Sequence, residues 1–489
     1  MGYIKKNKLQ IIMEAMYLGI MLPMFYSMIN AVPASDDFAF GSRTISDNLL
    51  LDAVGYSAWN WLYHSGRWLI FFIQKLINPL NANIHLGRIY GICMICIFLL
   101  VFGLLRYSLD IIYTAIVPKE KFDTRILVFI TITVLYTTYY YVEAYNWYIG
   151  ATAYALPFGL LLLTVAYAIR YGDSGKNKYY IGMILAGLIP ATNEFFDVPI
   201  GLLYMYVAYY VYRKKIKCKK DFIKITIPLV IYIICGISVV FAPGNFVRQD
   251  GYDIEPNLLI AVKQIGIDIF VRTKDILFHH PIAVAAFVVL FIIGTKVDII
   301  NGWTEVIIAF VLTVSSIFGT IFPYVYGRAM TTTYLDVRMQ YLVDYMLLIG
   351  MCICSMRLGL VANGYGINKV FKAIKAFAIT IISIYIIITG IYGQAYKKIV
   401  PFDIIRNRGL IAESYQFWNG VITEIEMNVD ENVVITRKEA PIWSPYFLYM
   451  GIVEDDIYDA RPEEIYANEK IMPNVYYEKN TITIRYLGE

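Results

Sequence analysis

Residues 9–32 read LQIIMEAMYLGIMLPMFYSMINAV, and the motif PASDDF follows directly at residues 33–38. The first stretch decides the class of the fold, because about 20 predominantly apolar residues in a helix cross the hydrocarbon of a bilayer. Lysines precede it and no small-residue cleavage site follows it, so we interpret it as an uncleaved anchor with a cytoplasmic N-terminus. Asp36 and Asp37 then stand together at the membrane surface. Adjacent carboxylates repel each other there, so a chemical role has to be considered.

The whole chain has the composition of an integral membrane protein. Of its 489 residues, 58% are hydrophobic and 16% are charged, whereas soluble proteins carry about 25% charged residues. The net charge of +4 is spread over short loops, which indicates membrane topology and argues against nucleic acid as a partner. The many Ile, Tyr, Lys and Asn residues are typical of AT-rich bacterial genomes. We therefore expect a multi-pass protein among the lipids of a bacterial plasma membrane.

Hydropathy predicts an α-helical polytopic protein with about eleven transmembrane helices. Some of the apolar runs are short or contain proline, and the fifth and sixth could form a broken or re-entrant pair. The predicted spans lie at residues 9–32, 84–105, 125–142, 148–169, 179–192, 198–212, 222–241, 276–294, 303–323, 337–356 and 374–392.

Charge assigns the loops to two sides. Threading the chain from a cytoplasmic N-terminus places four basic loops inside, as the positive-inside rule requires. These loops contain Lys119, Lys121 and Arg125; Arg170, Lys176 and Lys178; residues 213–220; and Lys369, Lys372 and Lys375. The same threading places nearly every unusual polar residue in outer loops. We therefore predict that the outer face carries the chemistry.

Two outer segments have structure of their own. In the first outer loop, residues 33–83, two apolar pieces at residues 49–62 and 68–80 are too short to span and predict interfacial helices. Residues 1–392 form the predicted transmembrane domain. The tail, residues 393–489, is charged and contains alternating runs at 432–436 and 481–485, which predict strands of a small extracytoplasmic α/β domain.

Asp36 and Asp37 are the first candidate site residues. A base that deprotonates a sugar hydroxyl needs a carboxylate near the acceptor oxygen, and a place at the bilayer surface suits a lipid-linked co-substrate. The alternative is helix capping, since Ser-Asp-Asp is good N-cap chemistry.

Two further motifs pair an arginine with a turn. The run HSGRW contains His64 and Arg67, and PGNFVR contains Asn245 and Arg248. A guanidinium offers forked donors that match a phosphate, and glycine lets backbone amides approach an anion. Arginines that snorkel to lipid headgroups are the alternative.

Other polar groups interrupt later apolar segments. Asn193 and Glu194 lie between the fifth and sixth predicted spans, and Glu143 lies between the third and fourth. Such groups are costly at membrane depth unless they face a cavity, which favours a pocket. Arg328 and Arg338 flank the last large break, and either could instead pair with Asp336.

The order of these motifs resembles the GT-C superfamily of membrane glycosyltransferases, with an acidic motif after the first span and interfacial helices in the first outer loop. Within it, SDDF, HSGRW, the Asn-Glu break and APGN-x-x-R look like the bacterial glucosyltransferase-like family that includes O-antigen-modifying enzymes. The likeness covers the membrane region.

The resemblance implies transfer of a sugar from an undecaprenyl-phosphate carrier to a cell-surface polysaccharide or teichoic-acid-like acceptor, with inversion at the anomeric carbon. Asp36 or Asp37 would be the base. Some members of the superfamily use a divalent metal ion near the acidic motif, so such an ion is a candidate cofactor, although no cluster of additional acids stands out. Arg67, Arg248 and Arg328 would hold the phosphate, and Asn193, Glu194, His64, Asn245 and Glu143 would contact the sugar or the acceptor.

Two other functions use similar features. A flippase or transporter of lipid-linked glycans also needs many spans and cationic residues, but its cavity should place charges within several spans. Here the clearest spans are nearly free of charge. A polysaccharide polymerase or ligase differs mainly in its acceptor.

Overall fold

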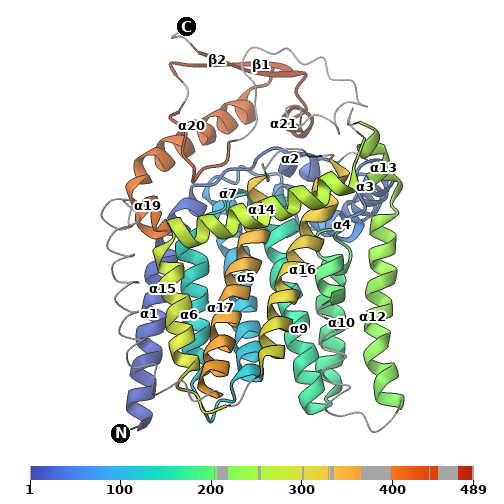
Figure 1. Cartoon of the computed structure of the whole chain (residues 1–489). Helices are drawn as coiled ribbons and strands as arrows, with labels where there is room; N and C mark the ends of the chain where they lie inside the picture. Colours follow the sequence, from blue (N-terminus) through green and yellow to red (C-terminus); the bar gives the residue numbers. More distant parts are fainter. Residues whose placement is uncertain are drawn as a thin grey trace.

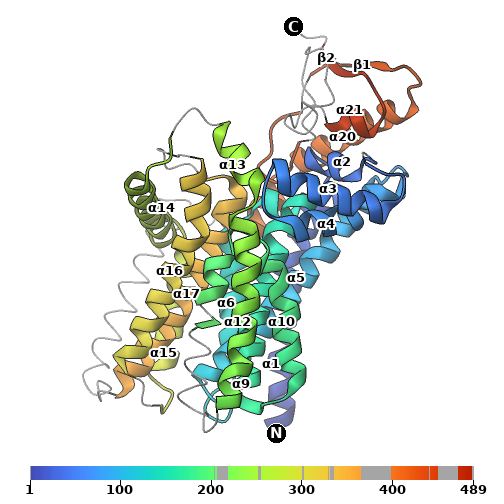
Figure 2. The ribbon, with the colours of Figure 1, turned by 90° about the vertical axis from the view of Figure 1, so that its right-hand side faces the viewer.

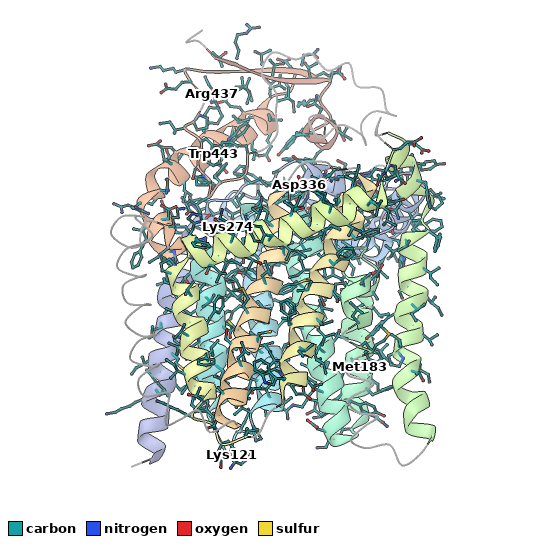
Figure 3. The ribbon with its side chains drawn as sticks, in the orientation of Figure 1. Lys121, Met183, Lys274, Asp336, Arg437 and Trp443 are labelled. Carbon is teal, nitrogen blue, oxygen red and sulfur yellow. The ribbon has the colours of Figure 1, made fainter. Side chains whose placement is uncertain are left out.

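A computed structural model describes residues 2–43, 45–202, 204–205, 219–251, 255–299, 302–328, 330, 335–364, 398–439, 441–449 and 472–486. These residues form a mostly helical molecule whose two chain ends lie at opposite ends of a helical bundle (Figure 1). Figure 3 places Lys121 at the end that holds the N-terminus, and Asp336 toward the opposite end. We call the end with the N-terminus the lower end and the other the upper end.

Among the described residues, six helices are long and apolar enough to cross a membrane. This indicates a membrane-embedded protein. They are α1 (Gly2–Ile29), α5 (Arg88–Ile116), α9 (Leu156–Ser174) with the turns that lead into it from Tyr148, α12 (Lys219–Val240) with α13 (Pro243–Asp250), α16 (Trp303–Gly327) and α17 (Val337–Gly364).

The other predicted spans are shorter or lie elsewhere. Three of them correspond to α6 (Thr124–Thr138), α10 (Asn177–Ala191) and α15 (Pro281–Gly294), each shorter than the usual 17–25 residues of a spanning helix. The predicted span 198–212 lies only partly within the described residues, and 374–392 lies outside them. The count of eleven therefore stays a prediction.

A helix occupies much of the segment between the predicted spans 222–241 and 276–294, which the threading of the chain places outside as a loop. Residues 242–275 contain α13 and most of α14 (Leu258–His279), which runs across the upper part of the bundle in Figure 1. Helices α14 and α15 meet at an angle of 89°. The corner falls at His280, directly before Pro281, whose ring restricts the preceding residue to an extended conformation. The predicted span at 276–294 is thus a shorter helix that begins after this corner.

Helices form at both places where the sequence predicts interfacial ones, and their position at a membrane surface stays a prediction. They are α3 (Leu49–Tyr63) and α4 (Trp68–Leu76), preceded by the short α2 (Asp36–Gly41). The Asn48 side chain caps α3 by accepting hydrogen bonds from the amides of Leu50 and Leu51. A fully buried ion pair of 3.1 Å between Lys75 Nζ and Asp52 Oδ2 ties α4 to α3.

The described part of the tail forms a small unit on the upper end. It contains α19 (Val400–Arg406), α20 (Arg408–Met427), β1 (Asn432–Arg437), α21 (Met472–Tyr476) and β2 (Thr481–Tyr486). The two strands form where the alternating runs predict them, and they pair in parallel. Figure 2 shows this unit beside α2 and α3. The Tyr476 and Tyr477 rings each lie 5.7 Å from the Phe38 ring of α2, so the tail covers the acidic motif.

Candidate functional site

A cavity of about 870 Å³ opens at the upper end of the bundle. Its walls come from α2, α3, α4, the turns from Trp147 to Tyr154 that lead into α9, the turn after α10, the upper end of α12, α13 and the upper ends of α16 and α17. Its volume lies within the roughly 300–1,000 Å³ of small-molecule sites. Segments far apart in the chain meet here: of the candidate residues, Asp36, His64, Arg67, Glu194, Asn245, Arg248 and Arg328 line this upper cavity.

Asp36 and Asp37 face different surroundings. Asp36 is half-buried and lines the upper cavity, whereas Asp37 is fully buried. Consecutive residues of a helix point about 100° apart, because a turn has 3.6 residues. Just before them, Ser35 has φ 40° and ψ −113°, a backbone conformation that residues other than glycine rarely adopt. The strained residue sets the direction in which α2 starts and so directs Asp36 to the cavity.

Asp37 holds this turn in place. Its Oδ2 accepts hydrogen bonds from the Ala34 amide at 3.0 Å and from the Tyr90 hydroxyl at 2.6 Å. Its Oδ1 accepts one from the Ile149 amide at 3.2 Å. Burial raises the pKa of Asp37 to about 7, against the lowering effect of these hydrogen bonds. The carboxyl group is therefore occupied by the protein itself and does not face the cavity.

Arg67 is a buried cation with a carboxylate partner. Its Nε lies 3.1 Å from Glu194 Oε1, and its Nη1 donates to the Tyr154 hydroxyl at 3.3 Å. Burial alone would lower the pKa of the guanidinium, but Glu194 and Tyr154 hold it above its ordinary value. The Phe71 and Phe195 rings lie on its flanks, with centroids 5.7 and 5.4 Å from Cζ. The guanidinium of Arg67, a group suited to bind a phosphate, is thus fixed in one position at the cavity wall.

The HSGRW and PGN turns interlock. A Cβ atom on Gly66 would lie 2.1 Å from the Val239 carbonyl oxygen, and one on Gly244 would lie 2.4 Å from the His64 amide nitrogen. Only glycine permits both approaches. The Asn245 side chain accepts from the Gly66 amide at 3.1 Å and donates to the Val239 carbonyl at 2.7 Å. Asn245 therefore joins the two motifs, although it also lines the cavity.

His64 sits among three of the cavity's arginines. Burial, and after it the charges of Arg248, Arg67 and Arg328, lower its pKa to about 3. The imidazole is neutral at ordinary pH. It can thus exchange hydrogen bonds with a ligand, but adds no positive charge.

Arg328 and Arg338 share one carboxylate. Arg328 Nη1 donates to Asp336 Oδ2 at 3.2 Å, and Arg338 Nη2 donates to the same atom at 2.9 Å. The alternative that either arginine pairs with Asp336 is thus confirmed for both. Arg338 also lies 3.8 Å from Glu143 Oε2 and feels the charge of Asp36. Glu143 thereby positions Arg338 and does not line the cavity.

Arg248 differs from the other arginines of the wall. It lies on α13, half-buried, and lines the upper cavity. Within the part of the chain that the structure describes, no ion pair or hydrogen bond is found for its side chain. Its guanidinium is the cation of the wall that a ligand can reach without displacing a described carboxylate.

One predicted contact is structural, and one wall residue was missed. The Asn193 amide is buried, donates to the Ala153 carbonyl at 2.8 Å and accepts from the Phe195 amide at 3.2 Å. Asp197, one helical turn beyond Glu194, lines the cavity instead. Burial, and then the charge of Glu194, raise the pKa of Asp197 to about 9, and neither of its carboxyl oxygens has a hydrogen-bond partner among the described residues. Its spacing from Glu194 was the available sequence signal.

Arg338, which the sequence placed at the last large break without assigning it to the site, also lines the upper cavity. Counting it, four guanidinium groups and three carboxyl groups of the described residues line the upper cavity, and one of those carboxyls, Asp197, is neutral at pH 7. The cavity is therefore suited to an anionic ligand. Among the described residues, no group of three or more His, Cys, Asp or Glu side chains is placed to hold a metal ion.

Comparisons of the chain with protein-family models, with curated proteins and with solved structures give no match. The assignment of the site therefore depends on its own chemistry. That chemistry is a half-buried carboxylate, several guanidinium groups and aromatic rings around one cavity at the end of an apolar bundle.

Proposed function

We propose that the protein is a glycosyltransferase that moves a sugar from an undecaprenyl-phosphate-linked donor to a cell-surface polysaccharide or teichoic-acid-like acceptor. The observation that carries the proposal is the shared cavity: Asp36 lies with Arg67, Arg248 and Arg328 around one space. A carboxylate and a set of phosphate-binding groups are the two components that this reaction needs. Their position at the end of apolar helices suits a lipid-linked substrate.

The reaction assigns a role to each component. Asp36 accepts the proton of the acceptor hydroxyl, whose oxygen attacks the anomeric carbon of the donor sugar. The bond from that carbon to the phosphate oxygen breaks, and its electron pair stays on the phosphate. Arg67, Arg248 and Arg328 stabilise the charge that grows there. Attack from the side opposite the phosphate inverts the anomeric carbon.

The sugar would lie between the phosphate and Asp36. Glu194 Oε2 is buried without a hydrogen-bond partner among the described residues, as are both carboxyl oxygens of Asp197. Sugar hydroxyls would satisfy these acceptors, and neutral Asp197 can also donate a hydrogen bond. The Tyr324 ring at the same wall offers an apolar face for the sugar ring.

The membrane setting belongs to the same proposal. Basic loops at the lower end favour a cytoplasmic N-terminus, so the upper cavity and the C-terminal domain would face outward from a bacterial plasma membrane. A GT-C-like fold with about eleven spans is the architecture we propose, with residues 374–392 and 198–212 supplying spans beyond those described. A divalent ion stays a candidate cofactor for the acidic motif.

The test is an assay for a new glycosidic bond. Purified protein in lipid nanodiscs is mixed with radiolabelled polyprenyl-phosphate glucose, or another polyprenyl-phosphate hexose, and with cell-wall polysaccharide or teichoic acid. We expect label in the acceptor and release of polyprenyl phosphate. Movement of the labelled lipid across proteoliposomes without a new bond would replace the proposal with a flippase. Extension of a lipid-linked glycan as acceptor would identify a polymerase.

A further inference from the structure

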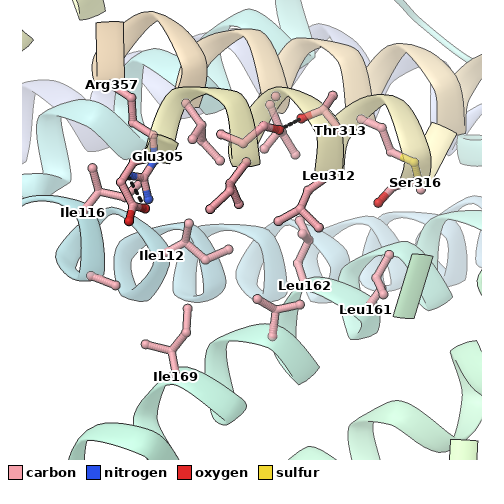
Figure 4. Close-up of a pocket in the computed structure, with 18 of the residues that line it drawn as sticks. Ile112, Ile116, Leu161, Leu162, Ile169, Glu305, Leu312, Thr313, Ser316 and Arg357 are labelled. Atoms are coloured by element: carbon pink, nitrogen blue, oxygen red, sulfur yellow. Dashed lines mark hydrogen bonds and ion pairs between the residues drawn. The ribbon is translucent and has the colours of Figure 1, made fainter. Parts of the chain in front are cut away.

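A second cavity of about 420 Å³ lies in the lower half of the bundle (Figure 4). Helix α5 packs against α9, α16 packs against α17, and the cavity separates these two pairs. Its walls are almost wholly apolar, with side chains such as Ile112, Leu162, Leu312 and Ile353. We call it the lower cavity. All four helices are candidate membrane spans, so we expect lipid chains around this part of the bundle.

The lower cavity is distinct from the upper one. On α16 the two are separated by the turn from Ser316 to Gly319, and on α9 by the turn from Tyr154 to Phe158. Among the described residues, Phe158 lines the lower cavity and none of the arginines of the upper wall does. The roles assigned to the upper cavity therefore do not explain the lower one.

Charged groups occur only at one place in its lining. Arg357 Nη1 and Glu305 Oε2 form an ion pair of 3.2 Å, which Figure 4 shows at one end of the cavity. Glu305 lies in the first turn of α16, and Arg357 lies in the lower part of α17. The Nε of Arg357 is buried and has no hydrogen-bond partner among the described residues. Burying an N–H group of this kind costs free energy unless another group accepts a hydrogen bond from it.

Hydrophobic cavities of this size take apolar ligands and exclude water. Within a bilayer the apolar ligand at hand is a lipid chain, whose headgroup then lies at the level of the polar end of the cavity. A phosphate there would accept the free N–H of Arg357. An anion alone would also meet the carboxylate of Glu305, whereas a lipid that carries both charges satisfies both members of the pair.

We propose that the lower cavity binds one acyl chain of a zwitterionic phospholipid of the ethanolamine type, with its phosphate on Arg357 and its ammonium group on Glu305. The lipid fills the space between the α5/α9 pair and the α16/α17 pair and thereby holds the two halves of the bundle together. This site is independent of sugar transfer, so its test does not depend on the proposed function.

Native mass spectrometry of the full-length protein tests the proposal. The protein is delipidated in detergent and titrated with dioleoyl phosphatidylethanolamine or with dioleoyl phosphatidylglycerol. We expect one tightly bound ethanolamine lipid and weaker binding of the glycerol lipid by about tenfold or more, the effect of one charged contact. Equal binding of the two lipids, or tighter binding of the glycerol lipid, would overturn the assignment.

Two variants locate the bound lipid. Arg357→Gln removes the phosphate contact and should weaken ethanolamine-lipid binding by about tenfold or more, and Ala309→Trp should fill the cavity and abolish it. Ile307→Trp is the matched control, because Ile307 is 56% exposed on the outer face of the same helix. Unchanged binding in both cavity variants, or equal loss in the control, would contradict the site. Thermal unfolding of each variant shows that it is folded.

A last arm separates the phospholipid from the tail of a polyprenyl phosphate. Polyprenyl phosphate is added to protein that already carries the ethanolamine lipid. Retention of the bound lipid supports the proposal. Displacement of the bound lipid, together with binding of polyprenyl phosphate that is itself lost in Ala309→Trp, would assign the lower cavity to the polyprenyl chain and overturn it.

Discussion

The wall of the upper cavity and the buried layer directly behind it use the same kinds of residue in opposite ways. The wall contains Asp36, half-buried, whereas the layer behind contains Asp37, Asp52 and Lys75, all fully buried. In the layer, every described charge has protein partners: Asp37 accepts three hydrogen bonds and Lys75 pairs with Asp52. In the wall, most of the arginines also have a carboxylate partner, but the charges lie beside open space. The comparison teaches that access to the cavity, more than residue type, separates the charged groups that can react with a ligand from those that hold the structure rigid.

The contacts of this buried layer explain how the strained turn at Ser35 is stabilised. Lys75 also donates to the carbonyl oxygens of Ala39 and Ser42, so α4 is linked to the end of α2. Burial lowers the pKa of Lys75 to about 8, and Asp52 counteracts this effect. With Asp37 fixed at one end of α2 and Lys75 at the other, the orientation of Asp36 is determined by contacts that no ligand would touch.

The largest expected effect is on the wall. Asp36→Asn keeps the shape of the side chain and removes the base, so we expect sugar transfer to fall by about 100- to 10,000-fold. Thermal stability should stay close to wild type, since the carboxylate is half-exposed. Turnover and thermal unfolding are measured on the same preparation. Wild-type turnover would remove Asp36 from the mechanism.

The next effect is on the layer. Asp52→Asn leaves the buried Lys75 ammonium without its counter-charge, and this should reduce the free energy of unfolding by about 3–5 kcal/mol. Asp47→Asn, at an exposed position of the same loop, is the control and should change it by less than about 0.5 kcal/mol. Thermal and chemical unfolding monitor both. Equal stability of the two variants would mean that the pair contributes nothing to the layer.

A smaller loss is expected for Asp37→Asn. An amide nitrogen would face one of the N–H or O–H donors that the carboxyl group accepts, which should cost about 1–3 kcal/mol. The pH dependence gives a second readout. Because the pKa of Asp37 is raised to about 7 in the folded protein, its stabilising effect is complete below about pH 4 and is lost as the pH rises through 7. The variant should lose this decline, and an unaltered pH profile would refute the assignment.

The smallest effect is expected for Arg248. Since Arg248 has no ion pair among the described residues, Arg248→Ala should leave stability unchanged and raise KM for the lipid donor by about tenfold. Arg248→Lys keeps the charge but not the forked donors, and it should recover part of the affinity. Steady-state kinetics with varied donor measures both. An unchanged kcat/KM for the donor would place Arg248 outside donor binding.

The sequence predicted the parts of the site that depend on local signals. The first apolar helix, the two helices after the acidic motif and the two strands are set by hydropathy and alternation over a few residues, and each forms. The gathering of Asp36, Arg67 and Arg248 followed from placing their loops on one side. The assignment of several loops to one side of the membrane is a coarse signal, but it is enough to predict that their side chains gather at one end of the bundle.

Other features depend on contacts between distant segments. The Lys75–Asp52 pair joins residues whose sequence shows only a lysine and an aspartate in amphipathic helices, so nothing marked them as buried. Asn193 looked like a pocket residue and instead completes the backbone hydrogen bonds of a turn. The segment of α14 read as a loop because its apolar residues are interrupted by charges, as expected of a helix that lies along a surface rather than across a membrane.

The central claim is that the donor phosphate binds in the upper cavity beside Asp36. The most direct measurement uses polyprenyl phosphate with a photoreactive group next to the phosphate, cross-linked to the full-length protein and mapped by peptide mass spectrometry. The account predicts adducts within residues 64–71 and 240–249, competed by unlabelled polyprenyl phosphate and weakened in Arg248→Ala. Adducts confined to residues 305–316 of the lower cavity, with none at the upper wall, would contradict it.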